Sequence, residues 1–426
     1  MKLVIIGGGF AGVNLAKELA NYKDIQITLV DKNNYNFFPP LIYQVATAFL
    51  EPSSISYPFR KLFHGKKNIQ FRLGDLRSVN MAENKVILNN GELSYDYLVF
   101  ATGAETNYFG MENVKKNAIP MKTLNDAIVM RNKMLQRMEK ASICKDSKER
   151  RKLLNIVVAG GGPTGVELSG MFAEMRNGIV RKEYPELTTT IANIYLVDGQ
   201  SAVLSPMSEK SQKNTYKALT DLGVIIKLNT QVKDYVDDTV YFSNGESIQT
   251  KNLIWTAGVG ARTFEGIPEE SYGRAKRMTV DAYNKLVNTT NVYSIGDTCI
   301  QNSDPKFPNG HPQVAQVAIQ QGLNLAKNFK AMLQNKPLTP FLYKDKGSMA
   351  IIGKNKAVVD LPKPKMHFKG FFAWMIWLFI HLISLITFRN KIRTFINWMV
   401  AYLAKDQSLR MIIRPDKKIK VVPKEV

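Results

Sequence analysis

Short apolar runs alternate with polar stretches along this chain, and two of the runs end in a glycine triplet. Residues 3–6 are apolar and lead into Gly7, and the arrangement recurs where residues 157–159 lead into Gly160. In both places apolar residues then return at helical spacing, so each segment predicts a buried strand, a tight turn and a helix. The first run is too short for the apolar core of a signal peptide.

The two turns share a glycine spacing that is typical of dinucleotide-binding loops. The aligned glycines are Gly7, Gly9 and Gly12 in the first turn and Gly160, Gly162 and Gly165 in the second. In such a loop the glycines permit a tight turn, a close approach to a pyrophosphate, and close packing of helix on strand. Free N–H groups at the start of the helix favour the anion. One such loop also fits an ordinary tight turn, so the repetition carries the inference.

An acidic residue ends the second strand of each predicted unit. Asp31 follows IQITLV and Asp198 follows ANIYLV, and a carboxylate in this position binds a ribose hydroxyl. The longer gap before Asp198 predicts an insertion around residues 176–190. Because its charge repels a 2′-phosphate, Asp198 favours NADH over NADPH. Two nucleotide sites in one chain are typical of a flavin that exchanges electrons with a nicotinamide.

Later segments of the second unit echo the first, which indicates two dinucleotide-binding domains in a repeat relation. The echoes are a strand at 97–101 before Thr102 and Gly103, a strand before Gly258, and a strand before Gly296 and Asp297. The predicted fold class is α/β, with two Rossmann-like domains and a C-terminal helical segment that anchors to a membrane. The expected domains are residues 1–110 with 280–335, residues 111–279, and residues 336–426.

The hydrophobic pattern changes after Pro364. Residues 371–388 are almost uniformly apolar and long enough to span a bilayer, although His381 and Ser384 interrupt the run. Residues 389–404 predict an amphipathic helix whose apolar face holds Ile392, Phe395, Ile396, Met399, Tyr402 and Leu403. We expect amphipathic membrane-anchoring helices at about 370–404, with a spanning helix or a dimer interface as the alternatives.

Composition narrows the possible partners. The formal net charge is +22. From Lys363 onward the chain has thirteen basic and three acidic residues, and this local positive charge suits binding to an anionic lipid surface. No recognition motif accompanies the charge, so nucleic acid is not an expected partner. Cys144 and Cys299 are far apart and the histidines lack ligand spacing, so we predict neither a disulfide framework nor a metal site.

Segments outside the glycine loops resemble a known family. ATG at 101–103 and GD at 296–297 match the two-dinucleotide-binding flavoprotein reductases, and residues 33–63 and 312–322 resemble the type II NADH:quinone oxidoreductases in particular. The resemblance covers almost the whole chain. Asn36 and Pro39 depart from the His and Gln that it leads us to expect.

The resemblance implies that the first loop holds FAD and that the second holds the substrate NADH. The implied FAD contacts are Gly7, Gly9, Phe10, Ala11, Gly12, Asp31, Lys32, Leu76, Thr102, Gly103, Asp297, Ala315, Gln316 and Lys346. The implied NADH contacts are Gly160, Gly162, Gly165, Asp198 and Gly258. An Asx turn is the alternative for Asp297, and a solvated loop lysine is the alternative for Lys346.

Gln316 and Gln320 are the implied quinone contacts. They are four residues apart and share one helix face beside the small side chains of Ala315 and Ala318. Two amides can hydrogen-bond quinone carbonyls without adding charge. The alternative is a helix packed through its small residues, with solvated glutamines.

The aligned loops differ in charge where Asn14 in the first becomes Glu167 in the second. Compensation of the helix dipole is the simple explanation. The resemblance instead places Glu167 near the flavin, between the nicotinamide and quinone sites, where a buried carboxylate could orient the nicotinamide or pass protons to the quinone. Glu167 is the predicted catalytic residue.

The expected reaction is hydride transfer from NADH to flavin N5, followed by two-electron reduction of a membrane quinone without proton pumping. The expected location is the cytoplasmic face of the cell inner membrane, bound peripherally, with a homodimer as a possible assembly. The alternatives are a membrane-bound NADH-sensing flavoprotein and a flavoprotein reductase that uses ferredoxin or oxygen. A disulfide or sulfide oxidoreductase of the same architecture would need a cysteine pair beside the flavin, and this chain has no pair that is close in sequence.

Overall fold

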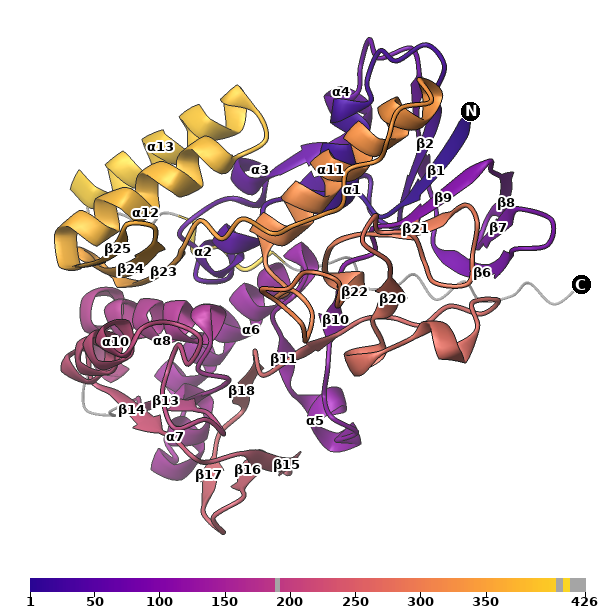
Figure 1. Cartoon of the computed structure of the whole chain (residues 1–426). Coiled ribbons are helices and arrows are strands. Elements are labelled where there is room, and N and C mark those ends of the chain that lie inside the picture. The colour runs from indigo at the N-terminus through magenta and orange to yellow at the C-terminus, as the bar shows by residue number, and fades with distance from the viewer. Residues whose placement is uncertain (188–191, 404–408, 414–426) are drawn as a thin grey trace, which may run out of the picture.

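A computed structural model describes residues 1–187, 192–403 and 409–413 of the chain. Figure 1 shows three structural parts: two sheets covered by helices, and a C-terminal sheet that carries the last two helices. Both covered sheets are parallel with five strands, so the predicted α/β class with two Rossmann-like sheets is confirmed.

The first sheet is formed by segments from both ends of the predicted discontinuous domain. In spatial order its strands are β21 (Val292–Ser294), β9 (Tyr97–Phe100), β1 (Lys2–Ile6), β2 (Gln26–Asp31) and β5 (Ile69–Leu73). Two helices, α1 (Phe10–Glu18) and α11 (Ala315–Leu333), pack side by side on it (Figure 1). Gly322 makes this close packing possible, because a Cβ there would approach the backbone of α1 within 2.6 Å.

The second sheet repeats this arrangement. Its strands are β11 (Ile119–Pro120), β18 (Asn252–Trp255), β12 (Ile156–Ala159), β13 (Ile194–Val197) and β14 (Val224–Lys227). Its principal helices are α6 (Leu124–Ile143), α7 (Ser147–Leu154), α8 (Pro163–Met175) and α10 (Glu209–Asp221). The strands β10 (Glu105–Thr106) and β19 (Val259–Gly260) pair antiparallel and join the two halves.

Each half also carries a three-stranded antiparallel sheet at the same place in the repeat. The first consists of β6 (Leu76–Asn80), β7 (Lys85–Leu88) and β8 (Gly91–Ser94), and the second of β15 (Val232–Val236), β16 (Thr239–Phe242) and β17 (Ser247–Gln249). The remaining strands are β3 (Tyr35–Phe37), β4 (Ser56–Pro58), β20 (Met278–Val280) and β22 (Cys299–Gln301).

Short helical turns complete the two halves. They are α2 (Ile42–Ala46), α3 (Pro52–Ile55), α4 (Phe59–Leu62), α5 (Glu112–Asn117), α9 (Arg181–Glu183), the π-helical η2 (Arg176–Val180), and the 3-10 turns η1 (Pro39–Leu41), η3 (Pro185–Leu187), η4 (Glu269–Ser271), η5 (Arg274–Lys276) and η6 (Gly296–Thr298). The elements η2, α9 and η3 lie in the predicted insertion, of which residues 188–191 are outside the described residues.

The C-terminal part is an antiparallel sheet followed by two helices. Its elements are β23 (Ser348–Gly353), β24 (Lys356–Pro362), β25 (Lys365–Lys369), α12 (Gly370–Ser384) and α13 (Phe388–Leu403). Strand β23 packs on α8, and α12 packs on β24. The apolar run at 371–388 breaks between α12 and α13, and within the described residues we find no helix long and apolar enough to cross a membrane.

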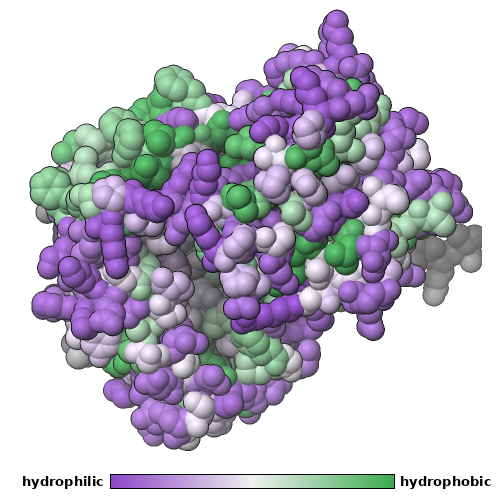
Figure 2. Space-filling view, in the orientation of Figure 1, coloured by the Kyte–Doolittle hydropathy of each residue, from purple (hydrophilic) through white to green (hydrophobic). Residues whose placement is uncertain are grey.

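Helix α13 turns its predicted apolar face to solvent and buries polar residues against the protein. Its polar residues Asn390 and Thr394 are buried against the first half, where Asn390 Nδ2 donates to the carbonyl of Ser54 at 2.8 Å. All six residues of its predicted apolar face are exposed, from 37% at Tyr402 to 70% at Leu403. Figure 2 shows hydrophobic side chains gathered over this part of the molecule. Position 404 and much of the basic tail, 405–408 and 414–426, lie outside the described residues.

Candidate active site

The glycine loops occupy equivalent positions, each between the middle strand of a five-stranded sheet and the following helix. The backbone at Gly7 and Gly160 has φ angles of +106° and +114°, which disfavour any residue with a Cβ. A Cβ at Gly12 or Gly165 would collide with the carbonyl oxygen of the glycine five positions earlier. These contacts explain why the two loops share the same spacing.

The middle glycine of each loop has a different reason to be glycine. A Cβ at Gly9 or Gly162 would meet no atom within 4 Å. Protein packing therefore does not require glycine at either position, whereas close approach of a ligand does. This open space, directly before α1 and α8, fits a phosphate held by backbone N–H groups.

Each predicted acid holds its own loop. Asp31 accepts hydrogen bonds from the backbone N–H of Gly8 and of Asn33, both at 2.7 Å. Asp198 accepts from the backbone of Gly161 in the same way, and from Gln200 N at 2.6 Å. Burial raises the pKa of Asp31, and the two backbone hydrogen bonds and Lys32 oppose that rise.

A cavity of about 840 Å³ joins residues of both halves and of the C-terminal part. That volume is within the range of cofactor sites. The predicted site residues that line it are Gly7, Gly9, Phe10, Ala11, Asp31, Lys32, Leu76, Thr102, Gly103, Asp297, Ala315 and Glu167. The structure thus brings together twelve positions that span most of the chain, and they offer the loop, acid and backbone groups that a flavin dinucleotide needs.

Asp297 faces this cavity from η6. Burial raises the pKa of its carboxyl group, and the nearby charges of Lys122 and Arg277 oppose the rise. The Lys122 ammonium lies 4.0 Å from one carboxylate oxygen. The Asp297 carboxylate is therefore a polar acceptor at the cavity wall, as a ribityl contact requires.

The NADH positions lie at the carboxyl edge of the second sheet. Gly160, Asp198 and Gly258 each follow one of three adjacent parallel strands, and ligands bind at such edges in open α/β sheets. They do not line the central cavity, but the first turn of α8 reaches it through Pro163 and Thr164.

Glu167 faces inward from the second turn of α8. Its side chain is 7% exposed and lines the cavity. Burial raises the pKa of Glu167 well above its ordinary value, and a hydrogen bond from the backbone of Ile351 in β23 partly opposes the rise. Its counterpart Asn14 only donates to the carbonyl of Phe10, at 2.7 Å. The buried, inward position makes dipole compensation a poor account of Glu167.

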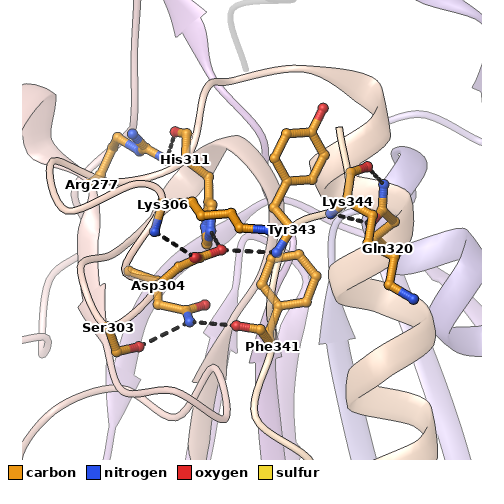
Figure 3. Close-up of polar contacts among 10 residues, drawn as sticks. Arg277, Ser303, Asp304, Lys306, His311, Gln320, Phe341, Tyr343 and Lys344 are labelled. Atoms are coloured by element: carbon orange, nitrogen blue, oxygen red, sulfur yellow. Dashed lines mark hydrogen bonds and ion pairs between the residues drawn. The ribbon is translucent and has the colours of Figure 1, made fainter. Parts of the chain in front are cut away.

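Of the predicted FAD and quinone contacts, four lie outside the cavity lining: Gly12, Gln316, Gln320 and Lys346. Gln320 donates to the carbonyl of Lys344 at 2.9 Å and accepts from its N–H at 3.1 Å, as Figure 3 shows. Gln316 likewise donates to Gly347 O at 2.9 Å and accepts from Lys346 N at 3.1 Å. The side chain of Lys346 is exposed. Both amides therefore hold the 344–347 segment against α11, and direct quinone contact stays a prediction.

Sequence reasoning missed His381 as a cavity residue. Its ring stacks on Trp377 with centroids 3.8 Å apart, and its Nδ1 lies 2.8 Å from the Trp377 carbonyl. Burial lowers the pKa of His381 to about 4, so it is neutral near pH 7. The sequence alone identified His381 only as an interruption of the apolar run at 371–388. Met349 and Asn36 also line the cavity and were not predicted.

Comparisons with known proteins agree with this geometry. A pyridine nucleotide-disulphide oxidoreductase family model matches residues 1–322, and an NDH2 C-terminal domain model matches residues 346–411. A type II NADH:quinone oxidoreductase of Mycobacterium tuberculosis is 35% identical over 95% of this chain and 88% of its own. One from Haemophilus influenzae is 28% identical over 84% and 86%.

Solved structures support the same fold. The Plasmodium falciparum NDH2 in complex with NADH superposes with a TM-score of 0.88 at 22% identity, covering 97% of this chain and 99% of that one. The sulfide:quinone oxidoreductase of Aquifex aeolicus gives 0.72 at 18% identity, covering 95% and 96%. The two cysteines here are both free, and Cys299 is buried.

Proposed function

We propose that this chain, which belongs to the type II NADH:quinone oxidoreductases, works at a membrane surface, with its three structural parts meeting at one cavity. Members of this family are flavoproteins that oxidise NADH and reduce a quinone. The observation that carries the proposal is the shared lining: the first loop contributes Phe10, the second half contributes Glu167, and helix α12 contributes His381.

We assign FAD to residues 1–110 and 280–335. The Gly9 loop would hold the pyrophosphate, Asp31 the adenosine ribose, and Asp297 the ribityl chain. Bound FAD supplies the two-electron carrier between the substrates. Lys346 is exposed and does not line the cavity, and its role near the flavin stays a prediction.

NADH is assigned to residues 111–279. The space at Gly162 suits its pyrophosphate, and Asp198 suits a ribose that carries no 2′-phosphate. Gly258 lies at the same sheet edge, where a side chain would contact Phe109.

Glu167 is assigned the proton chemistry of the cavity. Because burial raises its pKa, its carboxyl group holds a proton at a pH where an exposed glutamate has lost it. Quinone reduction consumes two protons, and a protonated carboxyl at the cavity wall can donate one and be reprotonated. Gln316 and Gln320 are assigned a positioning role, through the backbone that they hold.

The exposed apolar face of helix α13 supports docking to a lipid surface. The helix buries Asn390, Thr394 and Trp398 and exposes phenylalanine, isoleucine and leucine side chains, so covering its outer face with an apolar phase lowers the free energy. Arg389, Lys391 and Arg393 at its start suit anionic headgroups. We assign the protein to the cytoplasmic face of the inner membrane. A homodimer contact is the alternative way to cover the apolar face of α13.

The test separates the two half-reactions. Purified FAD-loaded protein in anionic vesicles is reduced by NADH without oxygen, and a short-chain quinone is then added while flavin absorbance is followed. We expect bleaching by NADH and recovery with quinone. Bleaching without recovery would leave an NADH-sensing flavoprotein instead. Deletion from Pro364 onward should release the protein from vesicles, and continued binding would contradict the membrane assignment.

A further inference from the structure

A second cavity, of about 380 Å³, lies between α6, the end of α8, and the insertion that precedes β13. It shares no lining residue with the central cavity. Its wall is mainly apolar, with Met134, Leu135, Met138, Phe172 and Met175 among its residues. Methionine-rich walls adapt to flexible apolar ligands.

Three arginines, Arg131, Arg176 and Arg181, interrupt this apolar wall, and Arg131 is the buried one. Arg131 lines the cavity and is only 4% exposed. Its Nε has no hydrogen-bond partner, and over the described residues we find no hydrogen bond or ion pair to the rest of its guanidinium group. Burial lowers the pKa of Arg131, yet a guanidinium does not lose its proton in proteins. Only Nε is a buried atom without a partner, so the terminal nitrogens of Arg131 are accessible at the cavity and have no protein acceptor among the described residues.

Two neighbouring arginines, unlike Arg131, have hydrogen-bond acceptors within the protein. Arg137, also on α6, donates to Asn252 Oδ1 at 2.7 Å. Arg176, at the same cavity, donates to the carbonyls of Ala192 and Leu222 at 3.0 and 2.9 Å. Arg137 and Arg176 thus have hydrogen-bond acceptors in the protein. Arg131 lacks such an acceptor and lies beside the open space of the cavity.

Among the residues that the structure describes, no acidic residue lines the cavity. The missing partner is thus an anion that also has an apolar body. A free phosphate or acetate would satisfy Arg131 and leave the apolar wall uncovered.

We propose that this cavity binds an amphiphile with an acyl chain and a terminal anion, the anion on Arg131 and the chain along the methionines. A carboxylate or phosphate accepts two parallel hydrogen bonds from a guanidinium group. The apolar wall gains from covering the chain. A free long-chain carboxylate and an acidic lipid offer the same chemistry.

The test uses FAD-loaded full chain in phosphatidylcholine nanodiscs, titrated with dodecanoate while the thermal midpoint is followed, with empty nanodiscs as the blank. Methyl dodecanoate tests the chain without charge, and acetate tests the charge without a chain. We expect saturable stabilisation by dodecanoate, at least thirtyfold weaker binding of the ester, and none by acetate at the same concentrations. Equal binding of dodecanoate and its ester, or no binding of dodecanoate, would overturn the proposal without any variant.

Two variants locate the anion. Arg131→Met removes the charge at similar length and places an apolar side chain in a mainly apolar wall, so we expect the variant to fold. We expect it to keep FAD and bind dodecanoate at least thirtyfold more weakly. Arg151→Met removes an exposed charge outside the cavity and should bind within twofold of wild type. Unchanged binding by Arg131→Met would refute the site.

Two further arms identify the source of the anion. Lysophosphatidylglycerol binding that is stronger than dodecanoate binding and lost in Arg131→Met would support a lipid, whereas the reverse order would support a free carboxylate. The third source is the chain itself, through Asp406, Asp416 and Glu425, which lie outside the described residues. If their joint replacement by amides raised dodecanoate affinity tenfold, the tail would be the occupant and the proposal would fail.

Discussion

Replacing Glu167 by glutamine tests whether its raised pKa is used in turnover. Glutamine keeps the size of the side chain and the acceptor for the Ile351 N–H, but it cannot exchange a proton. Positioned acid or base groups contribute roughly 10²–10⁴-fold to rates. We therefore expect quinone reduction to slow by about 100-fold, while flavin reduction by NADH changes little. Stopped-flow absorbance measures the two steps separately.

The same helix supplies a matched control. Glu174 is also largely buried, its pKa is also raised by burial, and it accepts a backbone hydrogen bond from Lys354. It does not line the cavity. Glu174→Gln should therefore leave turnover and its pH profile unchanged. If Glu167→Gln behaved in the same way between pH 5.5 and 8.5, the proton role of Glu167 would be refuted.

Stability against pH gives an independent readout of the Glu167 pKa. Because the folded pKa is raised above the ordinary 4.5, the folded state binds more protons than the unfolded state above that pH. Wild-type stability should thus fall as pH rises from 4.5 towards the folded pKa. Glu167→Gln lacks this loss, so its advantage in thermal midpoint over wild type should grow with pH.

Three further substitutions test separate parts of the structure. Asp198→Ala should lower the preference for NADH over NADPH in kcat/KM by about tenfold or more, since it removes a charged hydrogen-bond partner and a repulsive charge; an unchanged ratio would contradict its ribose role. Gly170→Ala should destabilise the fold by about 3 kcal/mol or prevent folding, because its Cβ would collide with a backbone carbonyl of β23, whereas Gly178→Ala has open space and should be near neutral in denaturant unfolding. Phe395→Glu should weaken vesicle binding about 10- to 100-fold in sedimentation, since burying a phenylalanine contributes about 1.5–3 kcal/mol, while Ile143→Glu, at an 81% exposed site away from α13, should not.

Local patterns made most of the nucleotide loops predictable. The steric reasons for Gly7 and Gly12 act within one strand–turn–helix unit, and Asp31 is at the end of the adjacent strand. Such short-range constraints leave their mark directly in the spacing of residues. The paired acids and the longer insertion before Asp198 followed from the same comparison.

Contacts between distant segments could not be predicted in this way. The amides of Gln316 and Gln320 were available for a quinone on the helix face, but the backbone of 344–347 occupies them. The run at 371–388 looked uniform, although Trp377 is fully buried while Met375 and Phe379, two residues away on either side, are exposed. Neither outcome is encoded in a period of 3.6 residues, because each depends on which segment packs there.

Helix α8 and strand β23 are in such close contact that only glycine fits at position 170. The C-terminal sheet also reaches α8 through the backbone hydrogen bonds that Glu167 and Glu174 accept. This sheet therefore acts as a bracket between the nucleotide loop at the start of α8 and the outward-facing helices. In the proposed orientation, NADH arrives from water and quinone arrives from lipid. The C-terminal sheet then fixes the position of the NADH loop relative to the helices that face the lipid.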